Sequence, residues 1–247
     1  MAGHSKWSKI KRKKGANDAK RGKIFTKLIR EITIAARMGG GDLESNARLK
    51  TAVMTAKSAN MPNDNIDRAI KKGAGGGEAD QLEEVTYEGY GPAGAALIID
   101  VLTDNKMRTL PEVRHILNKY NGNLGENGSV SWNFETKGYF TVSKKTIQEE
   151  TLMNLAIEAG ADDFSSEDES VFEIYSSVAN FHMVQNALEK HNIATESAQI
   201  SKLPKTMVSI DGKDAQNMLK IMELLDDNDD IQNVWTNADL PDEMMDS

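Results

Sequence analysis

Lysine and arginine are concentrated in the first thirty residues of the chain, where their charges could bind a phosphate backbone. This stretch holds 11 Lys and Arg residues against a single acid, Asp18, and it carries Trp7 among the cations. Clustered cations gain free energy on a polyanion because they displace its condensed counterions. The stretch therefore predicts nucleic-acid binding. The simpler alternative is a solvated and disordered basic terminus.

The predicted contacts combine phosphate-pairing charges, one stacking ring and a basic ridge along a helix. They are Lys6, Trp7, Lys9, Lys11, Arg12, Lys13, Lys14, Lys20, Arg21, Lys23, Lys27 and Arg30. An indole ring between lysines suits single-stranded or looped RNA, because it can stack on a base while the lysines pair with phosphates. A rigid basic helix could equally lie across duplex DNA and contact its phosphates. The charge count does not choose between DNA and RNA.

Charge is divided unevenly along the chain. Residues 1–79 hold 18 basic and 7 acidic residues, a net charge of +11. Residues 80–247 hold 12 basic and 31 acidic residues, a net charge of −19, which leaves −8 for the whole chain. One end is thus expected to bind a polyanion while the other repels it, which would orient the complex and limit non-specific coating.

Most catalytic and cofactor-binding patterns find no support in the sequence. Cysteine is absent, which excludes disulfides, thiolate catalysis and Cys-ligated metal centres and fits a reducing compartment. The four histidines lack the spacing of zinc-hydrolase helices. The segment Gly89–Gly94 matches G-x-G-x-x-G, but a strand is predicted after it in place of a helix, so we expect a turn. We expect no catalytic residue, no cofactor and no metal.

Acidic clusters leave one enzymatic alternative open. The run Asp226–Asp230, the pair Asp162 and Asp163, and the acids Asp100 and Asp104 near a strand end could together or separately ligate Mg²⁺ or Ca²⁺. The run does not fit the D-x-[DN]-x-[DN]-G loop pattern, and a polar turn between a helix and a strand requires no metal. We expect a solvated loop at this run. Its acids could instead form an anionic surface that faces the basic domain.

The elements that must position the basic residues are three helices. Apolar residues recur at the helical period, with cations on the opposite faces. The predicted helices cover residues 17–38, 45–60 and 63–72. Ser45 and Asn63 are the expected N-caps of the second and third helices. The segment Gly73–Gly77 is expected to be a flexible linker at the point where the charge changes sign.

After this linker the hydrophobic period changes from 3.6 to 2, and strands alternate with helices. Predicted strands cover residues 83–90, 95–103, 129–134, 139–143, 170–176, 196–203, 206–210 and 231–236. Predicted helices cover residues 108–120, 146–159, 178–191 and 214–225. The pattern predicts a multi-domain α+β protein with mixed or antiparallel sheets.

Three domains are expected from this alternation. Residues 1-79 form a basic three-helix domain, and residues 80-136 plus 204-240 form a discontinuous middle α/β domain. Residues 137-203 form an inserted α/β domain, because their strands and helices follow one another as in a ferredoxin-like unit. The strand, helix and strand after Pro204 are too short to form a domain alone, so we expect them to complete the sheet that begins at Glu83.

Several segments, in order from Met1 to about Ala238, are similar to the YebC family. They read MAGHSKWSKIKRKKGANDAKRGKIFTKLIREI, NARLKTAVMTAKSANMPNDNIDRAIKKGAG, YEGYGPAGAALIIDVLTDNKMRT, EVRHILNKYNGNLGENGSVSWNF, EAGADDF and LPKTMV. The resemblance implies a three-domain cytoplasmic protein that binds DNA and regulates transcription. The same family includes the mitochondrial translational activator of cytochrome c oxidase and members assigned to ribosome-associated translation, which implies an RNA-directed alternative.

The leading expectation is a non-enzymatic, DNA-binding transcriptional regulatory protein that contacts the phosphate backbone through its basic N-terminal domain. The alternative is a translation factor that binds rRNA or the ribosome through the same stretch. No run of about eighteen apolar residues occurs, and no apolar segment follows the basic N-terminus. We therefore expect a cytoplasmic protein with no membrane partner. The sequence predicts no oligomeric state.

Overall fold

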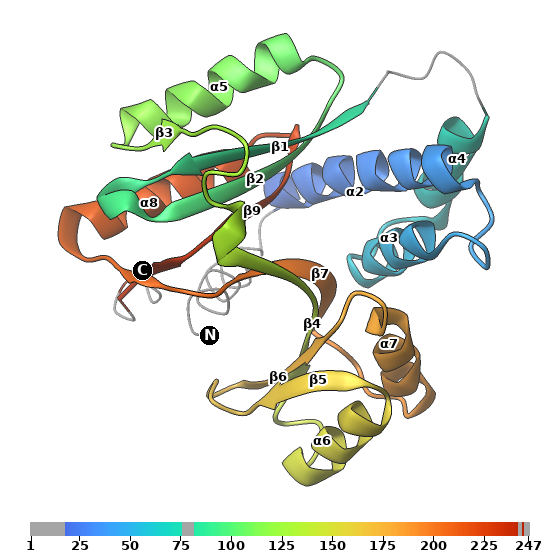
Figure 1. Ribbon diagram of the computed structural model, residues 1–247. Helices are drawn as coiled ribbons and strands as arrows, with labels where there is room; N and C mark the ends of the chain where they lie inside the picture. The colour runs from blue at the N-terminus through green and yellow to red at the C-terminus, as the bar shows by residue number, and fades with distance from the viewer. Residues whose placement is uncertain (1–17, 76–81, 242–243, 245–247) are drawn as a thin grey trace. The chain divides into compact units, whose positions relative to one another are not determined.

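The structure, a computed structural model, describes residues 18–75, 82–241 and 244 of the chain. These residues form two compact units: one holds the chain up to Asn133 together with the chain from Pro204 onward, and the other is Phe134–Leu203. The fold class predicted from the sequence is confirmed. A helical N-terminal region is followed by two regions that each contain a sheet, and the second region is inserted into the chain of the first (Figure 1).

Three helices make up the described N-terminal region. They are α2 (Asp18–Gly39), α3 (Ala47–Ser58) and α4 (Asn63–Ala74). Their apolar faces enclose one small core, in which Ile32, Leu49 and Ile66 are buried. These positions belong to the stripes that helical periodicity predicts, because residues three and four apart share a helix face.

The predicted helix caps are wrong. Asn46, and not Ser45, caps α3: its side-chain oxygen accepts the backbone N–H of Leu49 at 3.0 Å. The Asn46 amide also donates to two carbonyl oxygens near the C-terminal end of α2, both at 2.8 Å. It therefore fixes the start of α3 against the end of α2. Helix α4 begins at Asn63 directly after Pro62, and no side chain caps it.

The predicted linker also starts too early. Helix α4 continues through Gly73, which is buried against α2. A Cβ atom at this position would lie 2.3 Å from the carbonyl oxygen of Thr33 and 2.8 Å from the Cβ of Ala36. Glycine is therefore required here for close approach of two helices and not for flexibility. Gly76 and Gly77, the last two residues of the predicted linker, lie outside the described residues.

The sheet of the first unit has the strand order β3-β1-β2-β9. The strands are β1 (Glu83–Tyr90), β2 (Ala96–Thr103), β3 (Asn123–Leu124) and β9 (Ile231–Thr236). Strand β9 pairs with β2 in the antiparallel sense. The chain after Pro204 thus completes the sheet that begins at Glu83, as predicted. The G-x-G-x-x-G segment is a turn between β1 and β2, also as predicted, with Ala93 and Gly94 at positive φ.

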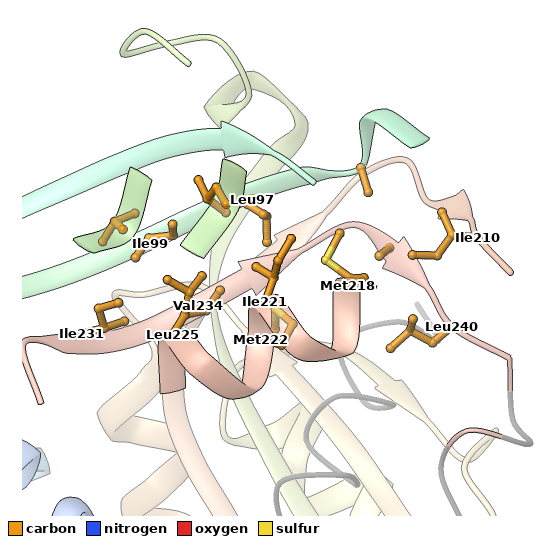
Figure 2. Close-up of a cluster of buried hydrophobic side chains, with 14 of the residues drawn as sticks. Leu97, Ile99, Ile210, Met218, Ile221, Met222, Leu225, Ile231, Val234 and Leu240 are labelled. Carbon is orange, nitrogen blue, oxygen red and sulfur yellow. The ribbon is translucent and has the colours of Figure 1, made fainter. Parts of the chain in front are cut away.

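Helices α5 (Lys106–Lys119) and α8 (Gly212–Asp226) pack on this sheet in one continuous apolar core. Figure 2 shows α8 side chains, among them Ile221 and Leu225, directed toward Leu97 and Ile99 of β2. The chain after Pro204 also contains a short parallel pair of strands, β8 (Val208–Ser209) and β10 (Ala238–Asp239). A strand of two residues is too short to show a hydrophobic period. For this reason β3 and β10 were not predicted, whereas β8 lies within the strand predicted for residues 206–210.

The inserted unit has the order strand, helix, strand, strand, helix, strand. Its elements are β4 (Phe134–Ser143), α6 (Glu149–Glu158), β5 (Ala161–Ser165), β6 (Val171–Ser176), α7 (Phe181–Lys190) and β7 (Ser197–Pro204). The sheet order β5-β6-β4-β7 and this succession make a ferredoxin-like fold. Phe140 and Phe181 stack in its core with ring centroids 4.8 Å apart. Strand β5, which holds Asp162 and Asp163, was missed by the sequence prediction.

The predicted strand over residues 129–134 is wrong. This segment is a loop that ends in a short 3₁₀ turn, η2 (Ser131–Asn133), before β4 begins at Phe134. Its alternating apolar residues imitate a strand, but the amides of Val130 and Ser131 donate to the buried carboxylate of Glu88 and not to a neighbouring strand. None of the helices in the described parts of the chain combines the length and the apolar character that a membrane crossing demands.

Candidate nucleic-acid interface

Most of the predicted contact residues lie outside the described structure. Those outside the described residues are Lys6, Trp7, Lys9, Lys11, Arg12, Lys13 and Lys14. Lys20 and Arg21 belong to α2, but their side chains are outside the described part. The remaining three, Lys23, Lys27 and Arg30, project from α2 at the spacing of one helix face.

The structure brings these three cations together, but against acids of the same chain. The Lys23 ammonium lies 3.1 Å from a carboxylate oxygen of Asp227. The Lys27 ammonium lies 3.3 Å from a carboxylate oxygen of Asp226 and donates to the backbone carbonyl of the same residue at 2.6 Å. The acidic turn after α8 is therefore not the solvated loop that we expected. It is the anionic surface facing the basic helix that we weighed as the alternative.

Asp230 is the centre of this contact. Its side chain is only 5% exposed, and one carboxylate oxygen accepts from Arg30 at 2.5 Å. The other oxygen accepts from Arg108 at 2.5 Å, from Thr109 at 2.7 Å and from Thr103 at 3.0 Å. Burial alone would raise the pKa of Asp230, but these four hydrogen bonds outweigh it and lower the pKa to about 2. The carboxylate is thus ionised and fully engaged.

Arg30 cannot be a free phosphate ligand in this arrangement. Its guanidinium also donates to the backbone carbonyls of Asp229 at 2.9 Å and Leu102 at 3.2 Å, and only 22% of its side chain is exposed. Removing one partner from a buried, hydrogen-bonded charge pair costs several kcal/mol, about 3–5 in measured cases. The more exposed Lys23, whose side chain is 42% exposed, is held by a weaker surface ion pair.

Arg48 of α3 is likewise engaged by acids. Its guanidinium forms two hydrogen bonds with Glu31 of α2, at 2.7 and 3.0 Å, and a further one with Glu84 of β1. Burial lowers the pKa of Arg48, but the bonds to Glu31 and Glu84 outweigh it and raise the pKa above its ordinary value. Arg48 therefore joins the helical region to the strand that follows it.

Other cations of the helical region point outward and were not among the predicted contacts. Lys50 and Lys57 of α3 are seven residues apart, so they lie within about 20° of each other around the helix. Lys57 and Lys71 are exposed, and Lys50 is partly exposed. Within the described residues, none of these three lysines has an ion-pair partner. Helical periodicity alone places them on the outer face, opposite the apolar stripes.

A second feature that the site prediction missed is an exposed aromatic ring. Trp132 lies in the loop before β4, and 68% of its surface is accessible. Tryptophan is highly buried on average in folded proteins. By contrast, Trp235 of β9 is only 4% exposed. The signal that could have found Trp132 is its setting, since the surrounding sequence GENGSVSWN is almost entirely polar.

The acidic residues do not converge on a metal site in the described structure. Among the residues it describes, no group of three or more histidine, aspartate or glutamate side chains is arranged to hold a metal ion. In the run after α8, Asp226, Asp227 and Asp230 each face a cation of α2. Charge pairing accounts for the geometry of this run.

Comparison with known proteins confirms the resemblance seen in the sequence. Residues 5–76 match the TACO1/YebC protein N-terminal domain, and residues 82–238 match the TACO1/YebC second and third domain. A protein of Citrifermentans bemidjiense named "Probable transcriptional regulatory protein" is 55% identical over 245 residues, which cover 99% of this chain and 98% of the relative. A protein of Desulforapulum autotrophicum with the same descriptive name is 53% identical over 247 residues, and the match covers 100% of both chains.

A solved structure is similar over most of the chain. The crystal structure of a conserved hypothetical protein from Aquifex aeolicus has a TM-score of 0.85 and 48% sequence identity, and the match covers 92% of this chain and 93% of that one. Sequence and fold thus agree along nearly the whole length, and the chain belongs to the TACO1/YebC family.

Proposed function

We propose that this protein is a non-enzymatic nucleic-acid-binding regulator that acts on transcription and contacts DNA phosphates through its helical N-terminal region. The observation that carries the proposal is the set of outward-facing lysines, Lys50, Lys57 and Lys71, on two packed helices. The names of the relatives from Citrifermentans bemidjiense and Desulforapulum autotrophicum support a role in transcription.

The charge of the helical region supports this proposal independently of the residues before α2. Residues 18–75 hold 12 basic and 6 acidic residues, a net charge of +6. Contacts from lysine to phosphate fix the position of a protein on a duplex but carry no sequence information. The strongly acidic remainder of the chain would be repelled by the same duplex, which favours one orientation of the complex.

The test measures the salt dependence of binding to duplex DNA by fluorescence anisotropy. If about five phosphates are neutralised, the logarithm of the affinity falls against the logarithm of salt concentration with a slope near −4 to −5. The triple variant K50Q/K57Q/K71Q should bind more weakly, with a slope smaller in magnitude by about 2 to 3. The matched control is K145Q/K190Q/K213Q, which removes the same charge from exposed lysines elsewhere in the chain.

Two results would count against the proposal. Equal effects of the triple variant and its control would show that net charge, and not the helical surface, determines binding. A footprint without any preferred promoter sequence at physiological salt would remove the transcriptional role.

A role in translation, through binding to RNA, is the second candidate. The exposed Trp132 ring favours it, because sequence-specific RNA recognition often stacks unpaired bases on aromatic side chains. Sedimentation with ribosomes after digestion of DNA is the test. Binding that persists in wild type and is lost in Trp7→Ala, or after neutralisation of Lys11, Arg12 and Lys13, would support this candidate. Absence of co-sedimentation would remove it.

A further inference from the structure

We propose that Trp132 is a stacking site for an unpaired base of a single-stranded nucleic acid, with Lys205 placed beside it for a neighbouring phosphate. This inference rests on the proposed nucleic-acid-binding function and adds a second contact surface, outside the helical region. Trp132 belongs to the loop of residues 125–133 that joins β3 to β4. The loop is held by hydrogen bonds, the ring is exposed, and a lysine ammonium contacts the backbone carbonyl of the same tryptophan.

A buried carboxylate holds the backbone of this loop. Glu88 of β1 is 6% exposed, and its two carboxylate oxygens accept the amides of Gly128 at 2.8 Å, Val130 at 2.7 Å and Ser131 at 2.9 Å. Burial raises the pKa of Glu88, but these backbone hydrogen bonds outweigh it and lower the pKa below its ordinary value. The charged form of Glu88 therefore fixes the three amides that precede the tryptophan.

The ring itself is fixed by its polar edge. The indole N–H of Trp132 donates to the carbonyl oxygen of Ser129 at 2.9 Å, and the hydroxyl of Tyr90 donates to the same oxygen at 3.0 Å. The only polar group of the indole is thus satisfied within the protein. What remains exposed is the aromatic surface, which is pre-organised and loses little conformational entropy when a planar partner stacks on it.

A cation lies beside the backbone of Trp132 on a second chain segment. The ammonium of Lys205 donates to the backbone carbonyl of Trp132 at 3.1 Å. Asn133 holds the two segments together, because its side chain accepts the amide of Thr206 at 3.0 Å and donates to the carbonyl of Thr206 at 3.1 Å. An aromatic face and a nearby lysine are the combination by which proteins bind single strands.

The polarity of the loop favours a base over a protein partner. Apart from the buried Val130 and the exposed Trp132, residues 125–133 are glycine, serine, asparagine or glutamate. A protein interface of normal size has an apolar core of several side chains, and this loop offers a single ring. A single base needs only one aromatic face, and any base can stack on it.

The experiment follows the tryptophans by ¹⁹F NMR of the full-length protein labelled with 5-fluorotryptophan. The chain has three tryptophans, and the Trp132 resonance is assigned as the one that disappears in Trp132→Phe. The probes are a 15-nucleotide oligo-U RNA, a 15-nucleotide oligo-dT DNA and a 15-base-pair DNA duplex. The buried Trp235 is an internal control for changes unrelated to stacking.

We expect either single strand to shift the Trp132 resonance. Trp132→Ala should lower the affinity for that strand about tenfold, the effect of one base stack, and change duplex affinity less than twofold. Trp132→Phe should restore most of the loss, because phenylalanine keeps an aromatic face. The two single-stranded probes show whether RNA or DNA is the preferred source of the base.

Several outcomes would overturn the inference. One such outcome is that wild type binds a probe without a change in the chemical shift of Trp132, and that Trp132→Ala binds the probe with normal affinity. In that case the stacking site is refuted and the proposed function stands. An equal loss on duplex and single strand would also refute stacking of an unpaired base. If wild type binds none of the three probes, both the inference and the proposed function fail.

Discussion

Replacing Asp230 with asparagine should destabilise the first unit far more than the same change at its neighbour Asp227. The side chain of Asp230 is 5% exposed and accepts four side-chain hydrogen bonds, two of them from arginines. The pKa of Asp230 falls from an ordinary value of 3.8 to about 2 in the folded protein. Each pKa unit corresponds to about 1.4 kcal/mol, so the charged form contributes about 2 kcal/mol to the free energy of unfolding at neutral pH.

The loss in Asp230→Asn should exceed this value because Arg30 loses its charged partner in a half-buried position. We expect a loss of about 2–4 kcal/mol at pH 7, equivalent to a fall in melting temperature of roughly 5–10 °C. Asp227, whose side chain is 58% exposed, pairs with Lys23 at the surface. Asp227→Asn should cost less than about 1 kcal/mol.

The pH dependence gives a sharper test, because the folded-state pKa of Asp230 is depressed. Its contribution is complete above pH 4 and is lost as the pH falls from about 4 toward 2, with about half gone by pH 3. The measurement is urea unfolding between pH 3 and pH 7, followed by tryptophan fluorescence. Trp132 and Trp235 both belong to the unit that contains Asp230.

Wild type and Asp230→Asn should therefore approach each other in stability as the pH is lowered, whereas wild type and Asp227→Asn should stay close throughout. Equal unfolding midpoints for the two variants at pH 7 would refute the central role of the Asp230 carboxylate. A difference between wild type and Asp230→Asn that does not shrink below pH 4 would refute its depressed pKa.

Three further predictions test other parts of the structure. Glu88→Gln should lower the free energy of unfolding by about 1–3 kcal/mol, because the NH₂ group of glutamine replaces an oxygen that accepts a backbone N–H. The ¹⁹F resonance of Trp132 should become narrower in this variant, because the loop becomes mobile. Gly73→Ala should lower the melting temperature, because its Cβ would lie 2.3 Å from the carbonyl oxygen of Thr33. The control is Gly22→Ala, whose Cβ meets no atom within 4 Å and which should raise the free energy of unfolding by up to about 1 kcal/mol. Asn133→Ala should speed proteolytic cleavage near residues 133 and 205, measured by mass spectrometry.

The helices and main strands could be predicted because their hydrophobic periods are long and regular. Helix α2 spans 22 residues and β1 and β2 span eight each, so local pattern decides their type. The short strands could not be predicted in this way. Strand β5 begins Ala161-Asp162-Asp163, and its two exposed acids in succession give no alternating pattern. Its identity as a strand depends on pairing with β6, which is a tertiary property.

The loop of residues 129–134 shows a local pattern overruled by a distant side chain. Val130, Trp132 and Phe134 alternate with polar residues, which favours a strand. The carboxylate of Glu88, more than 40 residues earlier in the chain, binds the amides that a strand would need for its ladder. Nothing within the loop sequence indicates this partner. The same Glu88 contact holds the backbone that precedes the exposed Trp132 ring.

The charged residues of the candidate site can be identified from the sequence, but their pairing cannot. The sequence identifies the basic face of α2 and the acidic run near residue 230, but Arg30 and Asp230 are 200 residues apart. Periodicity shows that both are on polar faces and cannot show that they meet. Helical periodicity also indicates the outward lysines on α3 and α4, but the density of positive charge is greatest before residue 30 and favours that stretch.

The pairing of α2 with the acidic turn changes which cations a nucleic acid can use. Exchanging the surface pair of Lys23 for a phosphate costs little, since such pairs contribute about 0–1 kcal/mol. Exchanging the pair of Arg30 would leave the buried Asp230 carboxylate without its partner, a cost that one phosphate contact does not offset. The basic face of α2 is therefore not uniform: Lys23 can exchange its acid for a polyanion, while Arg30 fastens the helix to the turn before β9. The acids after α8 thus anchor the helix through Arg30, and Lys23 is the cation of this contact that a polyanion can engage at low cost.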